Sequence, residues 1–328
     1  MIAVLATSIA FGLSLLMSGT ITHLQRESER VVALFDADRF VVADGGTGPF
    51  TTTRLLPAAL AAELRARDGV ERADAFVQAR DTLRDVDVNV LGLEPDGLGW
   101  PGVHDGRLPA GSGEVVVDVT LGYQRGDRIT LGDLDLAVVG RSTGTTYYFG
   151  MPAVFAVLED VQEGFLSGEP LATAVAVTGG DVTALPGTRV MGPDEAVADL
   201  NRPQRSAIQT VRIIDVLLWA LAAGVVASMV YLSVLEGARD IAVAKAVGTT
   251  TGSLFSGLAA QGLVLAVLAC AGGALLAIAL SPVMPFRVET TAGAYLGILG
   301  VGVAVGLVAA LVGLRRAVSI DPALAFGG

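Results

Sequence analysis

The sequence predicts an α-helical membrane protein with four transmembrane helices and one inserted extracytoplasmic α+β domain. Two observations carry this prediction: long apolar runs dominate the C-terminal third, and a charged, strand-rich segment precedes them. A helix needs about 20 apolar residues to cross a hydrocarbon core about 30 Å thick. Residues 213–235 and 254–280 meet this length, and the second run contains no charged residue.

The charged residues are concentrated in the middle of the chain. Of the 22 basic and 33 acidic residues, 17 and 28 lie between Gly19 and Arg212, which gives this segment a net charge of −11. Nucleic-acid binding needs a basic surface, so the composition argues against a nucleic-acid partner. The segment is long enough to form its own core or two small subdomains.

The hydropathy pattern divides the chain into eight parts. In order, we expect transmembrane helix 1 (1–18), an extracytoplasmic domain with helical stalks at both ends (19–212), transmembrane helix 2 (213–235), a cytoplasmic segment (236–253), transmembrane helix 3 (254–280), an outer turn (281–291), transmembrane helix 4 (292–314) and a cytoplasmic tail (315–328).

The basic residues of the short loops set the orientation in a cell membrane. Arg239 and Lys245, the only lysine of the chain, lie in the 236–253 segment, and two arginines lie in the tail. The opposite side has only Arg287. Short cytoplasmic loops carry the excess of positive charge, so both termini are predicted to be cytoplasmic.

The first apolar run, 1–18, has two interpretations. A cleaved signal peptide would begin with basic residues and end at a small-x-small site, and neither is present. An uncleaved anchor fits better. The run is short for a full span and has no polar lead-in, which leaves open whether the chain begins upstream of Met1.

Helical and strand patterns fill the middle segment. We expect helices over Thr20–Ala37, as a stalk that continues the anchor, over Pro57–Arg67, and over Pro193–Val211 as the second stalk. Short β-rich runs bounded by turn residues predict strands over 40–43, 73–77, 86–93, 114–119, 128–131, 134–139 and 172–177. The glycine cluster at 44–49 lacks the Lys-Ser/Thr of a phosphate loop and predicts a plain turn.

Catalytic and metal chemistry are not indicated. Cys270 is the single cysteine, and His23 and His104 are far apart, so we expect no metal site. Asp215 lies near the end of its span, whereas ion-coupled transporters usually carry an ionisable residue at mid-membrane. We therefore expect no enzyme, and no cofactor bound by this chain. Tyr147, Tyr148 and Phe149 are interpreted as packing residues.

Small residues recur in the membrane helices, and the polar segment between two of them is amphipathic. Glycines of the third and fourth spans indicate either close helix packing or general glycine richness: Gly262, Gly272 and Gly273 in the third, and the pairs Gly293 with Gly297 and Gly302 with Gly306 in the fourth. As a helix, the segment from Glu236 would end at Gly248, a natural C-terminal stop. It would either lie on the membrane surface or dock into a soluble partner.

Two motifs near the C-terminus, with looser ones in the middle, resemble a known family. The run Leu235-Glu-Gly-Ala-Arg-Asp-Ile-Ala-Val-Ala-Lys-Ala-Val-Gly248 resembles the hallmark segment of FtsX-like permeases, and the tail Ile320-Asp-Pro-Ala-Leu-Ala is similar to the family's closing motif. Gly106-Arg-Leu-Pro, the strand-like run from Glu114 to Asp118, and Gly126-Asp-Arg-Ile-Thr-Leu-Gly resemble the periplasmic core domain of MacB-type permeases.

The resemblance implies a type VII ABC transporter permease that works as a dimer with a second copy or a paralogue in membrane lipid. The chain has no Gly-x-x-x-x-Gly-Lys-Ser/Thr motif, so ATP would be used by a separate cytoplasmic ABC ATPase. The implied ATPase-coupling residues are Glu236, Arg239, Asp240, Ile241, Val243, Lys245, Ala246, Val247 and Gly248.

Three functions follow from these patterns. The first is export or extraction of an amphiphilic or envelope-bound substrate by mechanotransmission, with an extracytoplasmic adaptor as a further partner. The second is a regulatory membrane protein that transports nothing and activates an extracytoplasmic partner such as a cell-wall hydrolase. The third is an anchored binding domain without an ATPase, which the three membrane helices after the domain disfavour.

Overall fold

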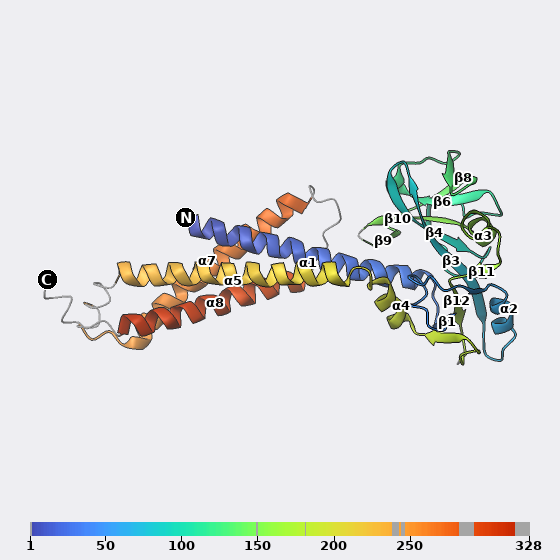
Figure 1. The fold of residues 1–328 in the computed structure, drawn as a ribbon. Coiled ribbons are helices and arrows are strands. Elements are labelled where there is room, and N and C mark those ends of the chain that lie inside the picture. The colour runs from blue at the N-terminus through green and yellow to red at the C-terminus, as the bar shows by residue number, and fades with distance from the viewer. Residues whose placement is uncertain are drawn as a thin grey trace. The chain divides into compact units, whose positions relative to one another are not determined.

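The computed structural model describes residues 2–148, 150–180, 182–237, 243, 247–281 and 292–318. The chain divides into two compact units, one made of Met1–His23 with Ser206–Gly328 and the other of Leu24–Arg205 (Figure 1). The elements are α1 (Ile2–Leu34), β1 (Arg39–Ala43), β2 (Leu56–Pro57), α2 (Leu60–Arg65), β3 (Arg72–Leu83), β4 (Val86–Leu93), β5 (Val103–Gly106), β6 (Glu114–Asp118), η1 (Val119–Leu121), β7 (Arg128–Leu131), β8 (Leu134–Ser142), β9 (Thr146–Tyr147), β10 (Met151–Val157), α3 (Leu158–Leu166), β11 (Leu171–Ala172), β12 (Ala174–Thr178), β13 (Thr188–Met191), α4 (Pro193–Leu200), α5 (Arg205–Glu236), α7 (Thr251–Leu280) and α8 (Ala292–Val318).

The first unit is helical and apolar, and we call it the membrane unit. Among the described residues, three helical stretches are long and apolar enough to cross a membrane: Val4–Leu34, Arg205–Met229 and Ala259–Leu280. The predicted fourth span falls in α8, where the apolar stretch Ala292–Val305 is shorter. A count of four spans therefore stays a prediction.

Close packing between α1 and α7 depends on small residues. A Cβ atom added to Gly12 would lie 3.0 Å from the Gly273 carbonyl oxygen, and one added to Gly272 would lie 2.4 Å from Ser8 Oγ. Removing the side chain lets two helices approach in this way. The prediction is thus confirmed for Gly272 and Gly273, while Gly297 has open space around it.

The second unit is built on a large mixed sheet, and we call it the sheet unit. Within the described residues the sheet has 11 strands in the order β13-β1-β12-β3-β4-β10-β6-β8-β5, with β7 paired to β8 and β9 to β10. The β4–β10 and β6–β8 pairs are parallel and the other pairs are antiparallel. A separate ladder joins β2 to β11.

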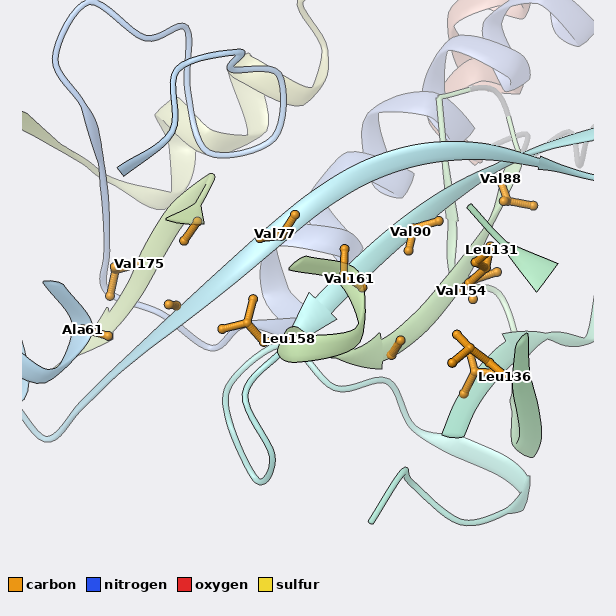
Figure 2. Close-up of a cluster of buried hydrophobic side chains, with 14 of the residues drawn as sticks. Ala61, Val77, Val88, Val90, Leu131, Leu136, Val154, Leu158, Val161 and Val175 are labelled. Atoms are coloured by element: carbon orange, nitrogen blue, oxygen red, sulfur yellow. The ribbon is translucent and has the colours of Figure 1, made fainter. Parts of the chain in front are cut away.

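One face of the sheet is covered by α2 and α3. Leu158 and Val161 of α3 lie among the valines of the sheet, including Val90 and Val154 (Figure 2). The approach is close, because a Cβ atom added to Gly92 of β4 would lie 2.6 Å from Val161 Cβ. This face forms the larger of the two apolar clusters of the unit.

The opposite face packs against the end of α1 and against α4. Its centre is a group of four phenylalanines, Phe35, Phe40, Phe50 and Phe76, whose neighbouring rings lie 4.5–6.4 Å apart. Val31 and Val32, in the last turn of α1, are buried in the same cluster. Thus the end of α1 is part of the core of the sheet unit.

Several predicted elements need correction. The predicted helix Pro57–Arg67 begins only at Leu60, because residues 56–57 pair with β11. The predicted stalk Pro193–Val211 is two helices, α4 and α5, separated by a turn at 201–204. The strand predicted over 172–177 is divided between β11 and β12.

Candidate functional site

The predicted coupling segment is only partly described. Glu236 ends α5 and is exposed, and Val243 and Val247 are 46% and 83% exposed. The predicted residues Arg239, Asp240, Ile241, Lys245 and Ala246 lie outside the described residues, as does the motif in the tail. The coupling role of the segment therefore stays a prediction.

The described backbone gives the segment a defined end. The Val247 N–H donates to the Val243 carbonyl oxygen at 3.0 Å, which is the spacing of an α-helical turn. Gly248 has φ 101°, a conformation that disfavours side chains with a Cβ. Thr250 then caps α7, since its hydroxyl accepts from the Ser253 N–H at 3.3 Å.

A polar cluster joins α1 to α5 inside the membrane unit. The Ser14 hydroxyl donates to Asp215 Oδ1, and Trp219 Nε1 donates to Ser14 Oγ at 2.5 Å and to Asp215 Oδ1 at 3.1 Å. The sequence predicts Asp215 near the end of a span, but it does not indicate the partner Ser14 on α1, which is 201 residues away. The Asp-x-x-x-Trp spacing within α5 was the available local signal.

The aromatic run at 147–149 was predicted to be packing. Tyr147 is 1% exposed within the phenylalanine face, where burial raises its pKa well above the usual value. The Tyr148 hydroxyl donates to the Phe50 carbonyl oxygen at 3.2 Å, and Arg80 lies over the Tyr148 ring. Packing is confirmed for the two tyrosines, and Phe149 lies outside the described residues.

The Gly106-Arg-Leu-Pro motif of the sheet unit holds an ion pair. Arg107 Nη1 donates to Glu114 Oε2 at 2.6 Å, and the Ala110 N–H donates to the same oxygen at 2.8 Å. The Arg107 hydrogen bond, followed by that of Ala110, lowers the pKa of Glu114 to about 2. The motif therefore closes a turn between β5 and β6.

Glu114 gives the sheet unit a pH-dependent stability. Its folded pKa is depressed below 4.5, so the pair contributes above about pH 4.5 and the contribution is lost as the pH falls toward about 2. We expect wild type and Glu114→Gln to differ in urea midpoint at pH 6 and to converge near pH 2. Arg107→Gln should behave in the same way. A gap that persists at pH 2 would show that the substitutions act through packing.

No group of three or more His, Cys, Asp or Glu side chains within the described ranges has the arrangement of a metal site. The other features described above are a helix whose two parts belong to different units, a polar link between α1 and α5, and a capped start of α7 after the polar segment.

Comparisons of the sequence with known proteins identify the family of this chain. A family model described as FtsX-like permease C-terminal matches residues 212–322. The permease Rv2563 of Mycobacterium tuberculosis (strain H37Rv), described as an uncharacterized ABC transporter permease, is 35% identical over 331 residues, covering 100% of this chain and 95% of its own. Rv0072 of the same organism, with the same description, is 36% identical with the same coverage.

Two solved structures are also similar. The periplasmic region of MacB from Actinobacillus actinomycetemcomitans matches with 12% identity and a TM-score of 0.38, covering 52% of this chain and 94% of that one. The extracellular domain of the ABC-type transporter YknZ from Gram-positive bacteria matches with 15% identity and a TM-score of 0.36, covering 47% and 98%. On the family model and the full-length relatives, the chain belongs to the FtsX-like ABC transporter permeases and is a membrane protein.

Proposed function

We propose that this chain couples ATP hydrolysis by a separate cytoplasmic ATPase to movement of an extracytoplasmic domain. The movement drives export or extraction of an amphiphilic or envelope-bound substrate by mechanotransmission. In this proposal the sheet unit lies outside the cytoplasm and both termini lie inside, as the basic residues of 236–253 and 315–328 favour. A second copy or a paralogue completes the dimer.

The observation that carries the proposal is the continuity of α1. This helix runs unbroken from Ile2 to Leu34 and contains no proline. Its first part belongs to the membrane unit, while Val31 and Val32 are buried in the core of the sheet unit. Sharp helix kinks arise at a proline, a Gly/Ser pair, a bulge or an inserted group. The helix continues through the one such feature in its sequence, the pair Ser18-Gly19, and an unbroken helix can carry a displacement along its length.

A regulatory membrane protein that activates a cell-wall hydrolase would use the same movement. The relatives, however, are described as ABC transporter permeases, which favours transport. Both functions require an ATPase at the polar segment, so the first experiment tests that contact.

The test is co-purification of the ATPase with the full-length chain from its native membranes. We expect wild type to retain an ABC ATPase and the double variant Arg239→Glu, Lys245→Glu to lose it. Reversal of two charges at a docking surface should weaken binding at least about tenfold, because mispaired interfacial charges cost more than 1.4 kcal/mol.

The matched control is Arg205→Glu, Arg212→Glu. It makes the same charge change at exposed positions in the first part of α5, far in sequence from the polar segment. It should retain the ATPase. Equal recovery of the ATPase with all three proteins, or no ATPase with wild type, would contradict the coupling role of residues 236–253.

A further inference from the structure

A short loop of the sheet unit is bound by a buried carboxylate of α4. We call residues Thr47-Gly-Pro-Phe-Thr51 the 47–51 loop. Asp199, in the last turn of α4, is 1% exposed, and its Oδ2 accepts from the N–H groups of Phe50 at 3.0 Å and Thr51 at 3.1 Å. Its Oδ1 accepts from the Thr51 hydroxyl. These bonds compensate the burial of a charged group.

The loop fits α4 closely and is held at its other end as well. A Cβ atom added to Gly48 would lie 2.2 Å from Asp199 Cγ, so a residue with a side chain does not fit there. The Thr47 carbonyl oxygen accepts from Arg189 Nη2 at 3.2 Å and Arg202 Nη2 at 3.4 Å. The loop is therefore held at one end by Asp199 of α4 and at the other by Arg189 of β13 and Arg202 of the turn after α4.

The other side of the loop contacts the end of α1. The Phe50 ring lies 5.6 Å from the ring of Phe35, the residue that follows α1. Ser28 of α1 donates to Asn201 Oδ1, directly after α4, at 2.9 Å. The loop and this hydrogen bond thus join the end of α1 to α4, the last helix of the sheet unit before the turn that leads to α5.

From this arrangement we infer that the 47–51 loop, held by Asp199, makes the ends of α1 and α4 move as one body with the sheet. Asp199 is a positioning residue in this inference, which rests on the proposed transmission of movement through α1 and α5. The covalent path from α4 to α5 is only the turn 201–204. Hydrogen bonds to a charged acceptor are stronger than neutral ones and better suited to fix the helix ends.

The test variant is Asp199→Asn, which keeps the side-chain shape but removes the charge. The bonds from the Phe50 and Thr51 N–H groups then end on a neutral amide oxygen, and the side-chain N–H₂ group faces the Thr51 hydroxyl. The matched control is Asp160→Asn. Asp160 of α3 is also buried and also holds a loop, through the Gly113 N–H at 2.9 Å and the Ser112 hydroxyl, but α3 covers the other face of the sheet. If Asp199 only held its own loop in place, Asp199→Asn and Asp160→Asn would leave the distance between α1 and α4 equally unchanged.

The readout is the distance distribution between two spin labels in the full-length protein in detergent. Labels at the exposed positions Glu29 of α1 and Ala198 of α4, in a Cys270→Ala background, report how firmly the two helix ends are held together. We expect one narrow distribution in wild type and in Asp160→Asn, and a broadened or split one in Asp199→Asn. Amide exchange of Phe50 and Thr51 should be at least about tenfold faster in Asp199→Asn, as loss of charge-assisted hydrogen bonds implies.

Faster exchange with an unchanged label distribution would overturn the inference, since the loop would then be a local feature only. If Asp199→Asn does not fold, the same two measurements are made on Thr51→Val. This variant removes the hydroxyl that donates to Asp199 Oδ1 and conserves the side-chain shape. The experiment needs no ATPase, so its failure would leave the proposed function standing, and loss of ATPase binding would leave this result intact.

Discussion

Replacing Phe35 by alanine should destabilise the sheet unit by about 3–5 kcal/mol, the usual cost of removing a fully buried aromatic ring from a core. Phe35 has 0% exposure and contacts three other phenylalanine rings. Since domains are stable by about 5–15 kcal/mol, the loss is a large share of the total. It should appear as a lower urea midpoint in the full-length protein.

The measurement can be made specific for the sheet unit. The chain has two tryptophans, and Trp219 belongs to the membrane unit, so Trp100 fluorescence in a Trp219→Phe background reports unfolding of the sheet unit alone. Phe165→Ala is the control, because it removes the same ring from a partly buried position on the other face. Equal midpoints for the two variants would show that the phenylalanine cluster is not a centre of stability.

Gly106→Ala should be the second large effect, with an expected cost of about 2–5 kcal/mol from backbone strain and overpacking together. Gly106 has φ 95°, and a Cβ atom there would lie 2.3 Å from the Val139 carbonyl oxygen. The obstacle is backbone of the neighbouring strand β8, which cannot rotate away as a side chain can. Trp100 fluorescence on urea unfolding measures the loss.

Gly113→Ala separates the two causes. Gly113 has φ 84°, but nothing lies within 4 Å of an added Cβ atom. This variant should cost only about 1–2 kcal/mol, the price of a left-handed conformation for an L-residue. If both glycine variants lost the same stability, steric contact with β8 would not be the reason for glycine at position 106.

The elements whose positions the sequence predicts well have either a clear hydrophobic periodicity or turn residues at their ends. Strands 86–93 and 128–131 were predicted with the bounds that the structure gives, since turn residues flank each of them. The continuity of the stalk with the first helix is confirmed by α1. The apolar runs at 213–235 and 254–280 lie within α5 and α7.

The elements that were missed have physical reasons. Strand β10 lies between β4 and β6 and is buried on both faces, so its sequence Met151-Pro-Ala-Val-Phe-Ala-Val157 has no polar alternation. The break between α4 and α5 was missed because the polar helical pattern continues on both sides of residues 201–204, although Pro203 is a residue that ends or kinks a helix. Pairings over long sequence distances, such as Asp199 with Thr51, leave no local pattern at all.

The candidate site was predicted from a motif, and a motif gives residue types without geometry. For Val243, Val247 and Gly248 the structure adds exposure and a helical turn that ends at glycine. Ser14 could not have been singled out, because serine is common in apolar helices. Only the fold brings it to Asp215.

The order of strands in the sheet places the first strand of the sheet unit beside its last two strands. The chain enters through β1 and leaves through β12 and β13, and β1 pairs with both of them. The connections between the strands from β3 to β10 can therefore change in length without separating the two ends. Such a unit can be exchanged or resized during evolution while its connections to the helices stay unchanged.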